Sequence, residues 1–372
     1  PDKIGFIFRV MIPLAPVLSE LQRLAEEETV CVLASGDPLF FGIAARVIAL
    51  LGAEHVDVVP APSSVQWAFA RAGLSWDDAS VISVHGRPLA GVCAQLRVLD
   101  KAALLTDAAY SPTRIAQHVL DHGVSYFEAH VCEHLTGPEE RVRRFTLPQL
   151  AAAQDVAPLN VLLLFRPRAA RAPLIAYLPE AAFERRVPKA GLITKREIRV
   201  LSLAALRLHE RSVVWDIGAG SGSVGIEAAL IARRGRVFAV ETDAECVAMI
   251  RENVQTHGAD NLSVVHGIAP DALAGVPAPD AVFVGGSKGS MQAIVEHALD
   301  KLAPGGSLVV NAITLENMHE SYAAVRGRGL APEVSLVQVS RAETLARYMR
   351  FAAQNPIQIL SVRKPAAPAE AS

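Results

Sequence analysis

The residues with the clearest pattern for ligand binding are a glycine-rich stretch, Asp216-Ile-Gly-Ala-Gly-Ser-Gly222, and an acid nineteen residues beyond it, Glu241. The apolar run before Asp216 predicts a buried strand, the glycines predict a loop, and residues 223–232 predict a helix. A second apolar run, residues 237–240, ends on Glu241. Glycines let the backbone approach a ligand closely, and a helix N-terminus offers N–H groups to it. Because an acid after the next strand can accept hydrogen bonds from ribose hydroxyls, the pattern predicts a nucleoside-containing cofactor.

Two kinds of cofactor fit this loop by spacing. Residues 220–225 also satisfy the G-x-G-x-x-G spacing of dinucleotide-binding turns. A carboxylate at the strand end, Asp216, would repel a pyrophosphate but attract the cationic amino-acid end of S-adenosylmethionine. The residues therefore favour S-adenosylmethionine over NAD, and an ordinary strand-turn-helix corner without a ligand is the plain alternative.

Length and composition predict two α/β domains. The chain has 372 residues, of which 51% are hydrophobic and 20% charged, enough for two cores. Its net charge of −2 indicates neither a nucleic-acid partner nor a membrane surface. The four cysteines form no C-x-x-C pair, and no apolar run is long enough to span a bilayer. We therefore expect free thiols and a cytoplasmic protein.

The first half, residues 1–168, alternates strand-like and helix-like segments, which predicts a largely parallel sheet covered by helices. Expected strands are residues 29–34, 55–59, 80–84, 102–105, 125–131 and 159–165, and expected helices are residues 39–51, 63–72, 89–99 and a helix that Ser111 caps and Gly123 follows. Ligands on such sheets lie beyond the carboxyl ends of strands. Two segments stand at such ends, Ser35-Gly36-Asp37-Pro38 and Thr106-Asp107. Each is also typical of a turn that binds no ligand.

The run Leu33 to Gly42 resembles the Gly-Asp-Pro loop of the tetrapyrrole methylases, and residues 60–66, 84–87 and 132–141 resemble the cobalamin-pathway branch of that family. These methylases fold as two α/β lobes with S-adenosylmethionine between them. The resemblance thus implies an N-terminal cofactor site formed by Ser35, Gly36, Asp37, Pro38, Thr106 and Asp107. The family opens with a strand and a Gly-rich loop. Residues 1–10 contain a single glycine, Gly5, and no Gly-rich loop, so we expect this domain to lack its first strand and loop.

A proline-rich segment separates the halves, and we place a linker at residues 169–188 and a second domain at residues 189–372. Thr194 and Glu197 have the T-x-x-E spacing of a capping box at the start of a helix that extends to about residue 208. The box does not account for three cations in the first turn, where the helix dipole disfavours them: Lys195, Arg196 and Arg199. They predict an anionic ligand, with simple solvation as the alternative.

After the glycine loop, further strands are expected at residues 262–266, 280–284, 307–311, 333–339 and 357–362, with helices ending near residue 256 and spanning 291–302. This order, with its terminal antiparallel strand pair, resembles the Rossmann-like sheet of class I S-adenosylmethionine-dependent methyltransferases. The resemblance assigns cofactor contacts to the glycine loop, the ribose-binding acid and the segment beside the adenine. The expected set is Thr194, Asp216, Gly218, Ala219, Gly220, Ser221, Gly222, Glu241, Thr242, Gly267, Ile268, Ala269 and Gly285.

Residues 191–197 and 284–287 resemble the cobalamin-pathway methylases that act with decarboxylation at precorrin C15. Both halves in one chain resemble the family of bifunctional, decarboxylating precorrin-6Y C5,15-methyltransferases. This resemblance implies methylation of a precorrin at C5 and C15, loss of the C12 acetate carboxyl group, and S-adenosylhomocysteine as co-product. The conjugated ring of the precorrin is itself the nucleophile in the methylation and the electron sink in the decarboxylation. We therefore expect no metal ion and assign no catalytic base.

A precorrin carries many carboxylates, so the resemblance also implies arginine and lysine partners for the substrate. The candidates in the C-terminal half are Lys195, Arg196, Arg199 and Arg347, and those of the N-terminal half are Arg87 and Arg141. A homo-oligomer is expected by family analogy.

Two other functions stay open. One is a class I methyltransferase for another small molecule, with a degenerate N-terminal domain that only binds or scaffolds. The other is an NAD-dependent oxidoreductase, against which Asp216 and the terminal strand pair argue.

Overall fold

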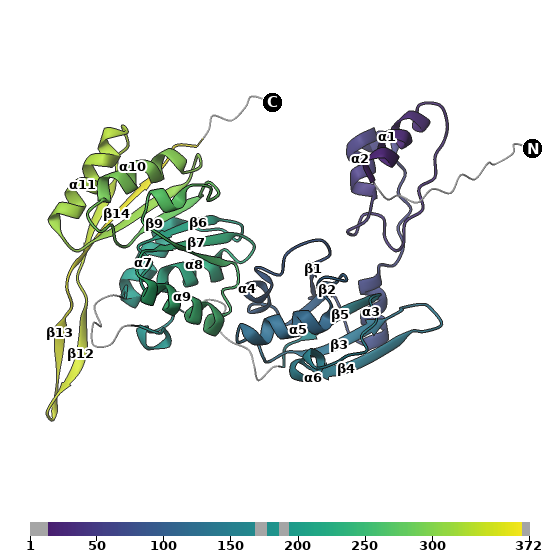
Figure 1. Ribbon diagram of the computed structural model, residues 1–372, viewed down its shortest axis with the longest axis horizontal. Coiled ribbons are helices and arrows are strands. Elements are labelled where there is room, and N and C mark those ends of the chain that lie inside the picture. The colour runs from purple at the N-terminus through teal and green to yellow at the C-terminus, as the bar shows by residue number, and fades with distance from the viewer. Residues whose placement is uncertain (1–13, 168–176, 186–192, 367–372) are drawn as a thin grey trace, which may run out of the picture.

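The computed structural model describes residues 14–167, 177–185 and 193–366, which form two large sheets, one in each half of the chain, and a two-stranded hairpin (Figure 1). Residues 80–165 supply a five-stranded sheet, and residues 213–363 supply a seven-stranded one. Among the described residues, no helix has both the length and the apolar character needed to cross a membrane. Most of the linker expected at residues 169–188 lies outside the described part.

The first described segment is helical, with α1 (Leu14–Ala25), α2 (Ala44–Leu51), the 3-10 turn η1 (Ala53–His55) and α3 (Ser64–Ala72). The strands expected at residues 29–34 and 55–59 are wrong, because both segments are irregular. A strand needs a neighbour for its backbone hydrogen bonds, and residues 14–79 contain no strand that could pair with either. Helices α1 and α2 contact each other and lie apart from the sheet (Figure 1).

The N-terminal sheet has the order β1-β2-β5-β3-β4. Its strands are β1 (Ser80–Ser83), β2 (Lys101–Leu105), β3 (Glu128–Glu133), β4 (Arg141–Thr146) and β5 (Asn160–Phe165). Only β1 and β2 pair in parallel, so the prediction of a largely parallel sheet is wrong. The chain leaves β3 through a hairpin to β4, passes α6 (Leu147–Ala151), and returns as β5 between β2 and β3, antiparallel to both.

Two helices of this domain, α3 and α5 (Pro112–Asp121), start where the sequence predicts. Ser63 and Gln66 form a capping box at α3, and Ser111 caps α5 by accepting from the Arg114 N–H. The helix expected at residues 89–99 is reduced to α4 (Val92–Leu96). Helix α3 packs against β3 and β5, and α5 packs against α6.

The C-terminal sheet has the order β11-β14-β10-β9-β6-β7-β8. Its elements are β6 (Val213–Ile217), α8 (Ser223–Ile231), β7 (Arg236–Glu241), α9 (Ala244–His257), β8 (Leu262–His266), η5 (Asp271–Leu273), β9 (Ala281–Val284), α10 (Met291–Lys301), β10 (Ser307–Ala312), α11 (Leu315–Gly327), β11 (Glu333–Val337) and β14 (Ile357–Arg363). Strands β6 to β10 pair in parallel, and β14 lies antiparallel between β10 and β11. The predicted Rossmann-like sheet with a terminal antiparallel pair is confirmed.

Two further pieces belong to this domain. Helix α7 (Arg196–Leu206) packs against β9, β10 and β14, and the short turn η3 (Glu180–Ala182) precedes it. The Arg-rich segment between the terminal strands forms a two-stranded hairpin, β12 (Ser340–Leu345) with β13 (Tyr348–Ala353). Figure 1 shows this hairpin extending away from the body of the domain.

The two domains contact each other through α4 and the end of α5 on one side and α8 and α9 on the other. The Asp260 carboxylate accepts hydrogen bonds from the backbone N–H groups of Cys93, at 3.0 Å, and Ala94, at 3.1 Å. Glycines allow the backbones to approach: a β-carbon on Gly258 would lie 3.1 Å from the His122 carbonyl oxygen.

Candidate functional site

The glycine loop lies between β6 and α8 at the carboxyl end of the parallel strands. Gly218, Gly220 and Gly222 all have positive φ, a conformation that costs other residues energy. Gly218 is also packed against Gly286 so closely that a β-carbon there would lie 2.5 Å from the Gly286 carbonyl oxygen. Gly285 donates its N–H to the Ile217 carbonyl at 2.9 Å, which holds the two loops together. Gly286 was not among the predicted site residues.

Asp216 is buried beneath this loop. Its Oδ2 accepts a hydrogen bond from the Gly225 N–H at 2.8 Å, in the first turn of α8. Within the described part of the chain its Oδ1 is buried without a hydrogen-bond partner. Burial raises the pKa of Asp216 to about 7, and the negative charge of Glu241 contributes to the same shift. A cationic group that reached Asp216 would therefore find a carboxyl group ready to ionise.

Glu241 ends β7 and faces the glycine loop. Its Oε2 accepts from the Gly220 N–H at 2.8 Å, and its Oε1 accepts from the N–H groups of Thr242, at 2.7 Å, and Asp243, at 3.0 Å. The carboxylate is thus fixed where the ribose-binding acid was predicted, at the carboxyl end of the strand beside β6. It holds the loop in place and presents oxygen atoms whose remaining lone pairs can accept from hydroxyl groups.

The other predicted residues of this site surround the same strand ends. Gly267 donates its N–H to the Glu241 carbonyl at 3.0 Å, which brings Gly267, Ile268 and Ala269 beside the end of β7. Ile268 is 65% exposed, so its apolar side chain is accessible at this edge of the sheet. Thr242 accepts a hydrogen bond from Lys288, a residue that no sequence motif singled out.

The hydroxyl groups near the loop provide a test of whether a polar ligand fits here. Ser221 and Ser287 have buried hydroxyl oxygens that lack hydrogen-bond partners among the described residues, like Asp216 Oδ1. Buried polar groups are normally paired, and these three atoms leave hydrogen-bonding capacity around the glycine loop that the polar groups of a ligand can use. The residues present therefore fit S-adenosylmethionine.

The three cations at the start of α7 do not share one role. Arg199 is fully buried, its Nε lies 2.9 Å from Glu227 Oε2, and it also donates to the carbonyls of Thr194 and Leu178. That environment occupies its guanidinium group and gives it a structural role in place of the predicted contact with substrate. Arg196 is exposed and Lys195 is half-buried at the N-cap position, and their predicted contact with substrate stays a prediction.

Glu197 has a different partner from the one that the sequence predicts. The N-cap residue of α7 is Lys195, without a side-chain cap, so the Thr194–Glu197 capping box is wrong. Glu197 and Glu180 instead bind Arg341, from the base of the hairpin. Burial alone would raise the pKa of Glu180, but the hydrogen bonds from Arg341 outweigh it and lower that pKa to about 2. Only the fold brings these three residues together.

The predicted N-terminal cofactor residues lie in two groups. Gly36 has positive φ and lies against residues 62–64 at the start of α3, and Asp37 Oδ1 accepts from the N–H groups of Leu39 and Phe40. Thr106 and Asp107 follow β2, where Asp107 accepts from the N–H groups of Gly86 and Tyr110, each at 2.7 Å. No hydrogen bond joins the two groups within the described residues, and each forms good local turn structure.

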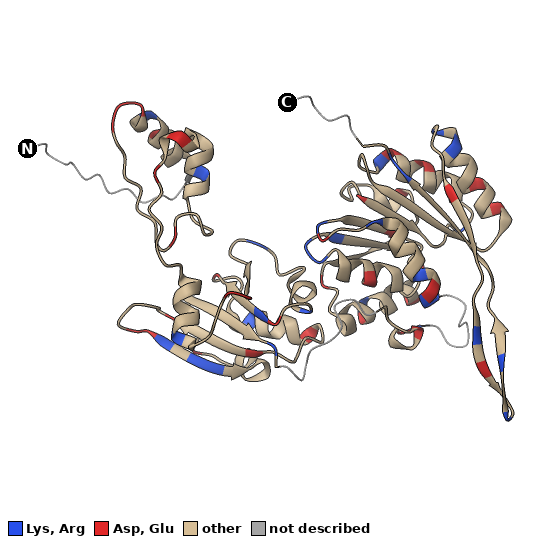
Figure 2. Cartoon of the chain, turned by 180° about the vertical axis from the view of Figure 1, so that it is seen from behind, with Lys and Arg blue, Asp and Glu red and all other residues tan. Residues whose placement is uncertain are grey.

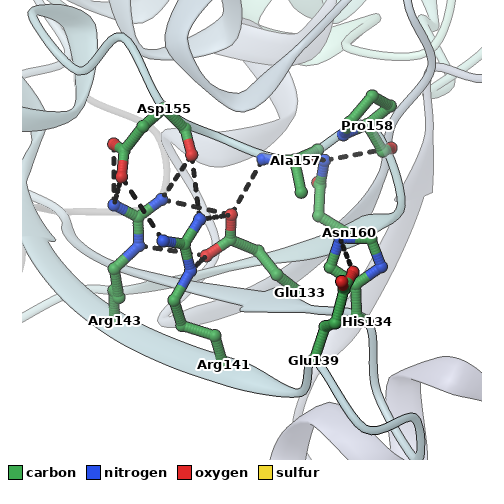
Figure 3. Close-up of polar contacts among 9 residues, drawn as sticks. All are labelled: Glu133, His134, Glu139, Arg141, Arg143, Asp155, Ala157, Pro158 and Asn160. Carbon is green, nitrogen blue, oxygen red and sulfur yellow. Dashed lines mark hydrogen bonds and ion pairs between the residues drawn. The ribbon is translucent and has the colours of Figure 1, made fainter.

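Arg141, a predicted partner of the substrate in this half, is held by protein carboxylates (Figure 3). Glu133, whose side chain is fully buried, accepts two hydrogen bonds from Arg141, at 2.9 and 2.8 Å, and two from Arg143. Burial would raise the pKa of Glu133, but the hydrogen bonds from Arg141, from the Ala157 N–H and from Arg143 lower it. Asp155 binds both arginines on the other side. In Figure 2 the basic residues of β4 appear as blue segments of that strand.

Comparisons with known proteins cover most of the chain. Residues 15–151 match a family model described as tetrapyrrole (corrin/porphyrin) methylases, and residues 186–364 match one described as a precorrin methyltransferase domain. A precorrin-6Y C(5,15)-methyltransferase [decarboxylating] from Sinorhizobium sp is 39% identical over 311 residues, which cover 80% of this chain and 73% of that protein. One of the same name from Mycobacterium tuberculosis is 34% identical and covers 94% of this chain and 86% of that protein.

The chain belongs to the family of decarboxylating precorrin-6Y C(5,15)-methyltransferases. It is accordingly an enzyme of the precorrin methyltransferase class. Among solved structures, a precorrin-6Y C5,15-methyltransferase from Geobacter metallireducens is 36% identical, covers 52% of this chain and 100% of that chain, and has a TM-score of 0.49.

Some members of the wider group are shorter. A protein from Pyrobaculum calidifontis named probable cobalt-precorrin-6B C(15)-methyltransferase (decarboxylating) is 37% identical over 186 residues, 50% of this chain and 94% of that protein. That protein therefore aligns over nearly its whole length with half of this chain.

Proposed function

We propose that this enzyme uses S-adenosylmethionine to methylate a precorrin at C5 and C15 and removes the carboxyl group of the C12 acetate, within cobalamin biosynthesis. The names of its relatives support the reaction. The observation that carries the C-terminal half of the proposal is the pair of buried acids around one glycine loop, Asp216 below it and Glu241 in contact with Gly220.

In this proposal the C-terminal domain carries out the C15 methylation and the decarboxylation. Glu241 binds the ribose, Asp216 faces the amino-acid end, and Gly267 to Ala269 lie beside the adenine. When bound, the cofactor supplies a methyl group on a sulfonium centre. The chain contributes position: the Gly218–Gly286 contact fixes the loop, while Lys195 and Arg196 at α7 orient substrate carboxylates. We do not count Arg199 among the residues that orient the substrate, because its guanidinium group is already bound by Glu227 and two carbonyl groups.

We assign the C5 methylation to the N-terminal domain, residues 1–168, with residues 169–188 as the linker and residues 189–372 as the second domain. Its cofactor residues in this proposal are Ser35 to Pro38 with Thr106 and Asp107. One observation favours a second candidate, in which this domain only binds or scaffolds: residues 14–79 form no strand and therefore no first-lobe sheet.

We also propose that the enzyme acts as a homo-oligomer in the cytoplasm. The β12–β13 hairpin supports the oligomer, because an isolated two-stranded hairpin is only marginally stable in water and this one exposes Met349 and Phe351 on one face. A second copy of the hairpin would cover that surface. The four cysteines are all free, which agrees with a reducing compartment.

Calorimetric titration of the full chain with S-adenosylhomocysteine tests the proposal. We expect one C-terminal site per chain that Glu241→Ala weakens, and a second site that this change leaves intact. A single site in the unaltered chain would favour the N-terminal domain that only binds or scaffolds. Tight binding of NAD without binding of S-adenosylhomocysteine would overturn the methyltransferase proposal.

A further inference from the structure

A cysteine and two histidines meet beside the contact between the two domains. Cys93 lies in α4, and His118 and His122 lie in and just after the last turn of α5. One potential ligand atom from each of the three lies within 4.8 Å of the other two. The histidines stand four residues apart, so a helix places them on the same face, and their ring centres are 4.3 Å apart. The expectation that this chain has no metal site overlooked this pair.

Hydrogen bonds already fix one nitrogen of each imidazole ring. His118 Nε2 lies 2.9 Å from Asp260 Oδ2, and His122 Nδ1 lies 2.8 Å from the His118 carbonyl oxygen. A carboxylate or a backbone carbonyl on one ring nitrogen is the arrangement that orients metal-binding histidines. The Asp260 side chain is 1% exposed and also accepts from the N–H groups of Cys93 and Ala94, so it belongs to both the cluster and the domain contact.

We propose that Cys93, His118 and His122 bind one Zn²⁺ ion, with a water molecule in the fourth position. One thiolate and two imidazoles are a donor set that suits zinc better than magnesium or calcium, which take oxygen ligands. The side chain of His118 is 21% exposed, which gives an ion and its water access from solvent. The ion ties α4 to α5, and Asp260 extends this connection to the C-terminal domain. The site is separate from the glycine loop and does not rest on the proposed methyl transfer.

The chain offers a matched control for the spacing. His130 and His134 also stand four residues apart, but His130 lies in strand β3 and His134 just beyond its end. At about 3.3 Å per residue, an extended chain separates such residues by about 13 Å, too far for one ion. His134 instead lies 3.9 Å from Glu139.

The test uses the full chain, stripped of metal and titrated with Co²⁺ and with Zn²⁺. We expect one equivalent bound per chain, and with Co²⁺ a thiolate-to-cobalt charge-transfer band that is absent from Cys93→Ser. His122→Gln is expected to weaken binding at least about tenfold, whereas His134→Gln leaves it unchanged. Because Cys93 is fully buried and its variant could misfold, the partly exposed His122 gives an independent measurement.

Asp260→Asn tests the connection between the ion and the domain contact. Loss of such a supporting carboxylate is expected to lower zinc affinity roughly 10–100-fold. Unchanged affinity in Asp260→Asn would overturn the role of the domain contact. No metal bound by the unaltered chain, or equal affinity in the unaltered chain and His122→Gln, would overturn the site itself.

Discussion

Gly218 and Gly286 touch backbone to backbone: a β-carbon on Gly218 would lie 2.5 Å from the Gly286 carbonyl oxygen and 2.7 Å from its nitrogen. The contact joins the loop after β6 to the loop after β9, at adjacent strands of the parallel sheet. Because neither backbone segment can give way like the end of a flexible side chain, the contact fixes the floor of the proposed cofactor site.

Gly218→Ala is therefore expected to lower both stability and cofactor affinity. The positive φ of +70° costs a non-glycine residue about 1–2 kcal/mol, and overpacking adds about 1–3 kcal/mol. Urea unfolding should show a loss of roughly 2–5 kcal/mol. Gly327→Ala is the control, since no atom lies within 4 Å of a β-carbon there. Equal stability of the two variants would contradict the described packing.

Asp216→Asn is expected to change how stability depends on pH. The folded-state pKa of Asp216 is raised to about 7 from 3.8, so its contribution is fully present below about pH 4 and is lost as pH rises to about 7. At pH 8 the variant should gain up to about 4 kcal/mol over the unaltered chain, and the gain should vanish near pH 4. Urea unfolding at both pH values measures this difference. A difference that does not vary with pH would rule out the raised pKa.

The same substitution should weaken binding of S-adenosylhomocysteine, because the neutral amide loses its attraction for the cationic amino-acid end. A gain in stability together with a loss in affinity separates this role from a purely structural one. Titration calorimetry with S-adenosylhomocysteine at pH 8 measures the expected loss of affinity.

Arg341→Ala is expected to destabilise the C-terminal domain and to remove part of its sensitivity to acid. The loss leaves the buried Glu180 carboxylate without its main partner, at a cost of roughly 1–3 kcal/mol. The lowered pKa of Glu180 gives stability that is present above its ordinary pKa of 4.5 and is lost as pH falls towards about 2. Arg341→Ala should therefore show a shallower decline of the urea midpoint between pH 5 and pH 3.

Arg350→Ala is the matched control on the same hairpin. Arg350 pairs with Glu343, and both side chains are about half exposed, so its loss should change stability by no more than about 1 kcal/mol. If Arg350→Ala cost as much as Arg341→Ala, the buried position of Glu180 would not be the cause.

Much of the C-terminal fold could be predicted from the sequence, because each parallel strand is a short apolar run, and β6, β7, β8 and β9 end at an acid or directly before a glycine. Strands β6 to β10 were expected within two residues of their ends. Strand direction in the N-terminal sheet could not be predicted in the same way. Apolar runs such as β5 look alike in either direction, and only the return of the chain after β4 and α6 reverses it.

In the candidate site, too, residues that are close in sequence could be predicted, and contacts between distant residues could not. Asp216, Glu241 and the glycines are close in sequence and carry a local pattern. The partners of Arg199 and Arg341 cannot be predicted locally, since Glu227 is 28 residues from Arg199 and Glu180 is 161 residues from Arg341. The sequence does not distinguish a buried, ion-paired arginine from a solvated one, and for this reason it predicts a contact of Arg199 with substrate where the structure has the ion pair with Glu227.

Phe351→Lys is expected to reduce the mass of the particle in solution to that of one chain. Phe351 is 78% exposed, and Met349, which is 65% exposed, lies on the same face of the hairpin, where a second copy is proposed to pack. Light scattering after size-exclusion chromatography measures the mass. Glu343→Gln, on the opposite face, should leave it unchanged. An unaltered chain that is already monomeric would remove the basis for this proposed contact.

The most direct measurement of the central claim is the mass of the product that the full chain and Glu241→Ala form from precorrin-6Y and S-adenosylmethionine. We expect the unaltered chain to add two methyl groups and to release one carbon dioxide per substrate. Glu241→Ala should lose the C15 methylation and the carbon dioxide release while it retains the C5 methylation. Release of carbon dioxide at the unaltered rate by Glu241→Ala would contradict the assignment of this chemistry to the glycine loop.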